Sequence, residues 1–186
     1  MNVARNGFRG WTAILCALTL GCASQATQLA ALSTKQPGPY LLGSGDEVRV
    51  TVVGLATSDS SYRVDDTGMI ALPMLQPIMV RGKTVREAEA AVAAALRVRR
   101  IVLDPNVSVQ VQTYRPFFIS GEVQRPGQYA FVPGMSLMTA VSIAGGYTFR
   151  ADKKTALVTR ASIEARAAPG TPIQPGDLIV VRERWF

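Results

Sequence analysis

The stretch Ile119–Leu137 reads "ISGEVQRPGQYAFVPGMSL" and separates short apolar runs with glycine and proline. The runs have the length of strands, and Arg125-Pro126-Gly127 between them has turn chemistry, because proline presets its φ and glycine tolerates positive φ. After a second turn at Pro133-Gly134, Ser136 is a suitable N-cap for a helix. The stretch therefore predicts a strand, a turn, a second strand ("QYAFV") and the start of a helix.

The rest of this half of the chain continues the same pattern. The helix is expected over residues 137–144, where Gly145-Gly146 supplies a C-terminal cap. Its apolar face consists of residues at helical spacing: Leu137, Ala140, Val141 and Ala144. Beyond the helix, "KTALVTR" predicts a strand, the alanine-rich segment after it predicts a loop, and "PGDLIVV" predicts a last strand. Residues 115–186 are therefore expected to form one small unit of strands and a helix.

The preceding half, residues 40–114, has a similar order of elements. In "GSGDEVRVTVV", three valines alternate with polar residues, which is the period of a half-buried strand. Asp66-Thr67-Gly68 has the composition of a hairpin turn between two more strands. A helix is expected over residues 85–97, with Thr84 and Glu87 as a capping box, and "DPNVSVQVQTY" returns to strand. The sequence thus predicts an α+β fold made of two small domains.

Composition and motif spacing argue against an enzyme. The chain contains no histidine, the commonest general base and metal ligand at neutral pH. Asp65 and Asp66 are adjacent, so on a strand they would point to opposite faces and not form a glycosidase pair. Asp46 and Asp177 each follow a glycine at a strand start, where aspartate usually bonds a turn backbone. No G-x-x-x-x-G-K-S/T phosphate loop occurs. We expect no catalytic residue, cofactor or metal site.

The charge of the chain gives no sign of a nucleic-acid partner. The formal net charge is +7, and without residues 1–21, which carry two arginines, it is 18 − 13 = +5, which is mildly basic. The densest cluster, "RVRR" at residues 97–100, lacks the interleaved aromatic residues of a nucleic-acid platform. Cations at the C-terminal end of a helix complement the helix dipole, and the cluster is interpreted in that way.

The first 21 residues have the composition of an export signal. Arg5 and Arg9 precede the ten-residue apolar run "WTAILCALTL", which is shorter than the span of about 20 residues that a bilayer needs. Gly21-Cys22 follows, and this pair resembles the lipobox of bacterial lipoproteins. The resemblance predicts lipid attachment at Cys22 and hence a mature protein outside the cytoplasm.

Two residues of the lipobox, Thr19 and Leu20, depart from its usual order, and cleavage after Ala23 by ordinary signal peptidase is the alternative. Either cleavage exports the chain. Residues 22–39 are polar and end in proline-containing "KQPGP", which predicts a tether between the anchor and the first folded domain.

Several segments, in this order, resemble the outer-membrane polysaccharide export proteins of Gram-negative bacteria: "YLLGSGDEVRVTVVG", "YRVDDTGMIALPML", "GKTVREAEAAV", "DPNVSVQV", "ISGEVQRPGQY", "AGGY" and "PGDLIVV". The first four are similar to the polysaccharide export domain, and the last three to the soluble-ligand-binding β-grasp domain. The boundary would fall near residues 114–116.

The resemblance implies a homo-oligomeric ring in the periplasm, anchored to the outer membrane through Cys22. The ring would act with an inner-membrane co-polymerase or chain-length protein to pass capsule or exopolysaccharide outward. Larger family members carry a further β-grasp domain and a C-terminal helix that crosses the outer membrane. This sequence ends at "VVRERWF", so a separate outer-membrane pore becomes an expected partner.

A periplasmic glycan-binding module, which tethers or senses polysaccharide without conducting it, is the alternative function. Its signature would be exposed aromatic side chains. Six aromatic residues of the second half are candidates, although aromatic residues on short strands usually belong to the core: Tyr114, Phe117, Phe118, Tyr129, Phe131 and Tyr147.

Overall fold

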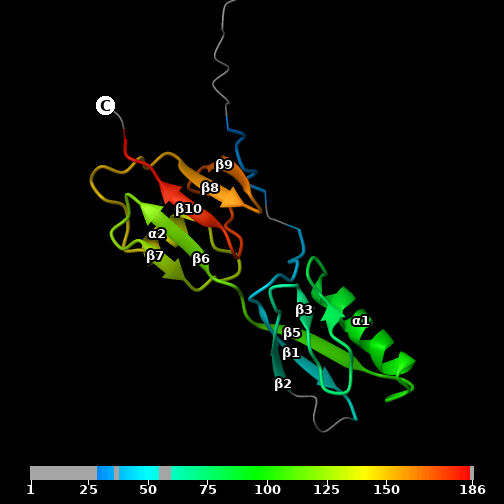
Figure 1. The fold of residues 1–186 in the computed structure, drawn as a ribbon. Coiled ribbons are helices and arrows are strands. Elements are labelled where there is room, and N and C mark those ends of the chain that lie inside the picture. The colour runs from blue at the N-terminus through cyan, green and yellow to red at the C-terminus, as the bar shows by residue number, and fades with distance from the viewer. Residues whose placement is uncertain (1–28, 36–37, 55–59, 185–186) are drawn as a thin grey trace, which may run out of the picture.

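The computed structural model describes residues 29–35, 38–54 and 60–184, which form two units that follow one another along the chain (Figure 1). Each unit combines strands with one helix, which confirms the expected α+β class. The predicted export signal and Cys22 lie outside the described residues. Within the described part of the chain, neither helix has the length and hydropathy that a membrane span requires.

The first unit is built around β1 (Glu47–Val52). β1 is the middle strand of an antiparallel sheet, between β2 (Ser60–Arg63) and β5 (Val107–Thr113). β3 (Met69–Ile70) and β4 (Ile78–Met79) form a separate two-stranded sheet. The valines of β1 are buried, as their alternation predicts. The turn at residues 65–68 also forms, but β2 and β3 on its two sides pair with other strands and not with each other.

The helix of the first unit, α1 (Val85–Val98), begins at the predicted capping box. The Thr84 hydroxyl accepts from the Glu87 N–H, and the Glu87 carboxylate accepts from the Thr84 N–H at 2.7 Å. The latter bond lowers the pKa of Glu87 below its ordinary value. At the other end, the N–H of Ile101 bonds the carbonyl of Leu96 at 3.1 Å, a Schellman ending. α1 therefore has defined caps at both ends.

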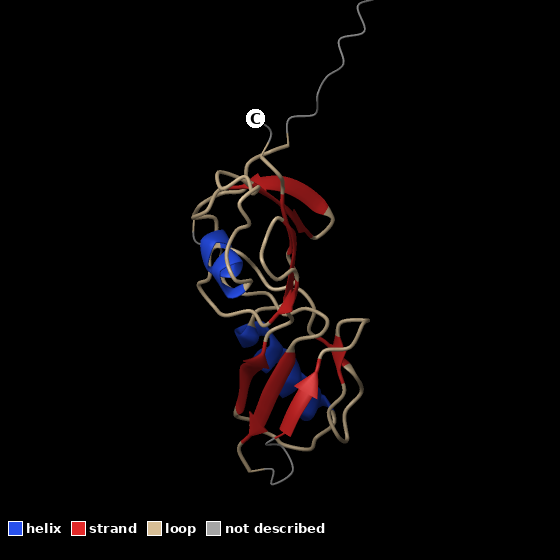
Figure 2. Ribbon diagram, turned by 90° about the vertical axis from the view of Figure 1, so that its left-hand side faces the viewer, coloured by secondary structure: helices blue, strands red, loops and turns tan. Residues whose placement is uncertain are grey.

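The second unit has a five-stranded mixed sheet in the order β7-β6-β10-β8-β9. Its strands are β6 (Phe117–Gly121), β7 (Gly127–Tyr129), β8 (Ala156–Arg160), β9 (Ile163–Ala167) and β10 (Leu178–Val181). β10 runs parallel to β6, and the other pairs are antiparallel. α2 (Leu137–Ile143) follows β7 and covers one face of the sheet (Figure 2). This arrangement is the β-grasp fold, in agreement with the resemblance.

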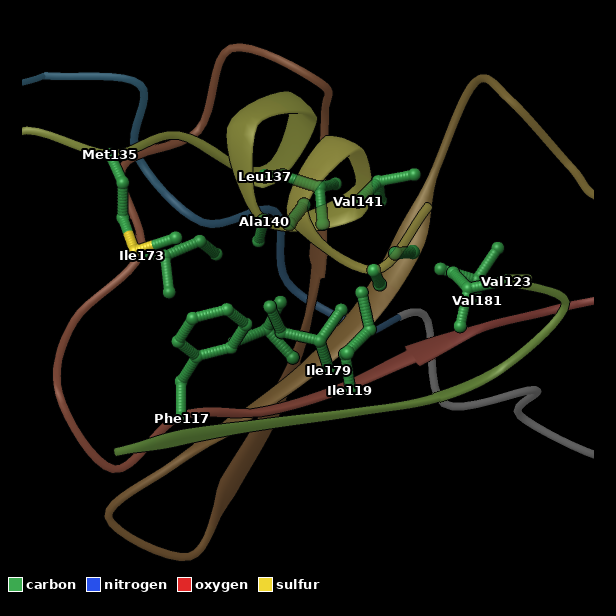
Figure 3. Close-up of a cluster of buried hydrophobic side chains, with 14 of the residues drawn as sticks. Phe117, Ile119, Val123, Met135, Leu137, Ala140, Val141, Ile173, Ile179 and Val181 are labelled. Carbon is green, nitrogen blue, oxygen red and sulfur yellow. The ribbon is translucent and has the colours of Figure 1, made fainter. Parts of the chain in front are cut away.

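The core of the second unit lies between α2 and the central strands. Figure 3 shows side chains of β6 and β10 directed toward the helix, among them Phe117, Ile119 and Ile179. Ser136 caps the helix by accepting from the Thr139 N–H, as predicted. Gly145 and Gly146 adopt φ of +87° and +92° just after the helix, so the predicted glycine cap forms.

The alanine-rich segment after β8 is a strand, which corrects the expectation of a loop. It forms β9 and pairs antiparallel with β8 through a two-residue turn at Ala161-Ser162. Both turn residues have positive φ, +46° and +70°, as a type I′ hairpin requires. The usual signal for this turn is Asn-Gly or Asp-Gly, so Ala-Ser concealed the hairpin.

The strand expected at "QYAFV" is shorter than predicted. β7 ends at Tyr129, and Phe131 leaves the sheet to line the region where the two units meet.

On the far edge of the same sheet, Ala31 pairs in parallel with Arg166 of β9. The N–H of Leu32 donates to the Arg166 carbonyl at 2.7 Å. Residues 30–32 therefore lie along the outer edge of the second unit before the chain enters the first.

Candidate functional site at the junction of the two units

A groove of about 920 Å³ lies where the two units meet, and both contribute to its walls. Its volume is within the range of about 300–1,000 Å³ that small-molecule sites usually have. Tyr40 and Leu41 come from the start of the first unit, Tyr114 and Arg115 from the connection between the units, and Phe131 from the loop after β7. The groove is therefore a feature of the assembled chain and not of either unit alone.

Three half-buried aromatic rings form a continuous row in the groove. The ring centroids of Tyr40 and Tyr114 are 5.0 Å apart with an interplanar angle of 76°. Those of Tyr114 and Phe131 are 5.6 Å apart at 67°. These are edge-to-face contacts, the geometry that the quadrupoles of aromatic rings favour. The row runs from Tyr40 at the start of the first unit to Phe131 in the second, so it is a contact between the two units.

Asp46 is the buried centre of the polar part of the junction. Its carboxylate accepts from the Gly43 N–H at 2.8 Å, the Arg115 N–H at 2.9 Å and the Tyr40 hydroxyl at 2.5 Å. The Arg115 guanidinium lies 3.1 Å from the same carboxylate. Burial, and then the bond to Asp46, raise the pKa of the Tyr40 hydroxyl above its ordinary value. The Tyr40 hydroxyl thus donates to Asp46 and also accepts from Nη1 of Arg115 at 2.8 Å.

Asp177 repeats this arrangement at the start of β10. It accepts from the Gln174 N–H at 2.8 Å, three residues back, as Asp46 does from Gly43. Nε and Nη2 of Arg160 donate to the two carboxylate oxygens of Asp177, at 2.9 and 2.7 Å. The glycine before each aspartate has positive φ, +91° in one turn and +84° in the other. Both aspartates therefore bond turn backbones, as their glycine-aspartate context predicts.

Arg115 lies against both glycine-containing turns. The Arg115 side chain occupies the space that a larger residue would need in either turn. A Cβ added at Gly43 would lie 2.3 Å from Nη1 of Arg115, and a Cβ added at Gly176 would lie 2.9 Å from Nε of Arg115. The guanidinium also lies 5.7 Å from the Tyr40 ring centroid, within cation–π range. Arg115 therefore connects the first turn, the second turn and the aromatic row.

Two family models match the chain on either side of this residue. The model described as "Polysaccharide biosynthesis/export protein" matches residues 34–112. The SLBB domain model matches residues 116–173. The chain belongs to the polysaccharide export family. The groove lies at the junction of the two matched regions of this export-family chain.

Curated relatives carry corresponding names. The chain is 32% identical over 143 residues to the exopolysaccharide production protein ExoF of Rhizobium meliloti, covering 68% of this chain and 34% of the relative. It is 33% identical over 135 residues to the EPS I polysaccharide export outer membrane protein EpsA of Ralstonia nicotianae, covering 58% and 35%. It is 32% identical over 112 residues to the polysialic acid transport protein KpsD of Escherichia coli, covering 58% and 19%. The chain spans about a third or less of the length of these relatives.

Asp65 and the arginines at residues 97–100 have structural roles in this export-family chain. Asp65 is exposed and accepts from the Thr67 hydroxyl at 2.7 Å and the Met69 N–H at 2.8 Å, which lowers its pKa. In the described ranges, no group of three or more histidine, cysteine or acidic residues could hold a metal ion. The arginines of the 97–100 cluster are exposed at the end of α1, in agreement with the predicted helix end.

The aromatic candidates separate into core and surface. Phe117 is fully buried, whereas Phe118 is 43% exposed on the open face of the sheet. Tyr114 and Phe131 line the groove. Sequence reasoning did not identify Arg115 or Arg160 as partners of the two aspartates. The repeated glycine-aspartate turn was the available signal, since a buried carboxylate requires hydrogen-bond donors.

Proposed function

We propose that the chain is a component of a machine that exports capsule or exopolysaccharide across the periplasm toward the cell surface. The observation that carries this proposal is the pair of family matches, which occur in order, the first over residues 34–112 and the second over residues 116–173. The names of the three relatives above refer to production, export or transport of polysaccharide. In this role the protein conducts and does not cut the polymer.

The proposed machine contains several copies of this chain arranged as a ring. A ring requires two different surfaces on each copy that meet with a closing rotation. The open face of the second unit's sheet supports such a surface, because Phe118 and Leu178 are neighbours in register there and are 43% and 42% exposed. An inner-membrane co-polymerase or chain-length protein and a separate outer-membrane pore are the proposed partners.

Deletion of the gene is expected to abolish surface polysaccharide while the cytoplasmic precursors remain. The expected block is at export, and the cytoplasmic steps that make the precursors do not require this protein. The measurement is the amount of polysaccharide on the cell surface and of precursor in cell extracts, with plasmid-borne wild-type gene as the control. If the deletion strain exported a normal amount of polysaccharide but did not trim it, the result would favour an enzyme that acts on the polymer. Normal export with altered surface retention would favour the glycan-binding module.

A Cys22→Ala variant is expected to lose incorporated fatty-acid label and to leave the membrane fraction. The proposed anchor is an acylated cysteine, and two or more acyl chains hold a protein on a membrane far more firmly than one. Metabolic labelling followed by fractionation measures the effect. Unchanged labelling would contradict lipid attachment at this residue.

The released variant also suits sedimentation measurements of the proposed ring. A ring gives a discrete multiple of the 19.9 kDa chain mass, less the signal peptide.

A further inference from the structure

We propose that the groove at the junction of the two units binds a segment of the glycan chain, with the rings of Tyr114 and Phe131 as contact surfaces. This inference rests on the proposed function, from which it takes polysaccharide as the class of ligand. It adds a location and a mode of recognition. The groove is lined by aromatic rings and by fixed polar groups, and a sugar ring requires both.

The aromatic row matches the apolar part of a sugar. The faces of a pyranose ring consist largely of C–H groups, which pack against aromatic faces and exclude water. Tyr114 and Phe131 are half-buried and border the groove, together with the 48% exposed side chain of Leu41. Alternating edge-to-face contacts present rings in more than one orientation. The groove can therefore contact more than one sugar ring of a chain.

The polar lining matches the hydroxyl groups. The guanidinium groups of Arg115 and Arg160 border the groove and retain 28% and 27% side-chain exposure. Each is held in place by a buried aspartate, and Arg160 also donates to the Pro172 carbonyl at 3.0 Å. Because these side chains are fixed before a ligand arrives, little conformational entropy is lost when they bind it.

The charges of the groove are paired. Arg115 faces Asp46, and Arg160 faces Asp177. Recognition in the groove is therefore expected to depend on C–H packing and hydroxyl hydrogen bonds more than on net charge. Non-specific attraction of an acidic polymer to the mature chain, whose net charge is 18 − 13 = +5 without Arg5 and Arg9, would instead weaken steeply with salt. Salt dependence thus separates the two kinds of binding.

The test uses the mature chain with Cys22 replaced, and oligosaccharides released by partial acid hydrolysis of the polysaccharide that the producing bacterium secretes. Isothermal titration calorimetry measures affinity. Phe131→Ala is expected to weaken binding about tenfold, which corresponds to the loss of one buried aromatic contact. Phe149→Ala is the matched control, because Phe149 is in the same unit, outside the groove lining, and 91% exposed. Binding by the parent chain is expected to change less than about twofold between 0.1 and 0.5 M NaCl.

A second variant guards against a folding defect in Phe131→Ala. Leu41 lines the groove and is half exposed, so Leu41→Ala is expected to keep the melting temperature of the parent and still weaken binding about threefold. Equal affinity of the parent and both groove variants would overturn the inference. Loss of all binding in 0.5 M NaCl, or no binding by the parent, would also overturn it. A change in sedimentation of the groove variants without any sugar effect would assign the groove to contacts between copies.

Complementation of the deletion strain distinguishes this inference from the proposed function. If deletion abolishes export and the parent chain binds no oligosaccharide, the groove inference fails and the export role stands. If the deletion strain exports normally, the export role fails whatever the groove binds. If both hold, the strain complemented with Phe131→Ala is expected to export less polysaccharide than the strain complemented with Phe149→Ala.

Discussion

A Val92→Asp variant is expected to unfold the first unit under conditions where the parent chain is folded. Val92 lies in the middle of α1, has no exposed surface and belongs to the core that β1 and β5 complete. A carboxylate at this position would be buried without a partner, one of the few changes that cost more than about 3 kcal/mol. Thermal and urea denaturation followed by far-UV circular dichroism measures the loss.

Ala94→Asp is the matched control for this variant. Ala94 is two residues further along the same helix and is exposed, so the same substitution there changes helix propensity without burying a charge. The free energy of unfolding is expected to fall by no more than about 0.7 kcal/mol. If Val92→Asp melted at the temperature of the parent, the assignment of the buried face of α1 would be wrong.

The fold elements predicted from the sequence are those whose signal is local. α1 was predicted within one residue, because a capping box and a 3.6-residue period occur together. β1 was predicted because its valines alternate with polar residues. β9 was missed because its turn, Ala161-Ser162, lacks the residues that usually adopt positive φ. A turn imposed by strand pairing leaves little trace in the sequence.

The candidate site was predicted only in part for a related reason. The glycine-aspartate turns were recognised, and the hydrogen bonds from Gly43 and Gln174 connect residues three apart. The arginine that bonds Asp46 is 69 residues away, and the one that bonds Asp177 is 17 away. Such pairs depend on tertiary packing, which local patterns do not encode. Arg160 meets Asp177 because β8 pairs with β10 inside the second unit, whereas Arg115 meets Asp46 where the two units connect.

The groove depends on the same long-range packing. The sequence predicts Phe131 near the end of a strand, but β7 ends at Tyr129 and Phe131 lies in a loop that lines the groove. The strand pattern gives no information about the direction of that loop. Tyr114 is the residue after β5, beside the predicted boundary between the domains. The aromatic residues were therefore identified as candidates, but their meeting in one row required the structure.

An Asp46→Ala variant is expected to be the most damaging single change at the junction. The carboxylate is fully buried and accepts from two backbone N–H groups, the Tyr40 hydroxyl and the Arg115 guanidinium. Its removal leaves these donors without that acceptor and leaves the charge of Arg115 uncompensated. The charge left behind on Arg115 keeps 28% side-chain exposure and is partly solvated. Each buried donor left without an acceptor costs about 1–3 kcal/mol, so we expect a loss of about 3 kcal/mol in the first unit.

Amide hydrogen exchange measures this prediction better than a single melting curve, because a chain of two units need not unfold in one step. Protection in β1 and β5 is expected to fall far more than protection in β8 and β10. Asp66→Ala is the matched control, since Asp66 is an exposed aspartate of the same unit, and such a substitution usually changes stability by less than about 0.5 kcal/mol. Asp46→Asn, which keeps an acceptor but removes the charge, should fall between them. If Asp46→Ala and Asp66→Ala lost the same protection in β1 and β5, the prediction that the buried carboxylate stabilises the first unit would be wrong.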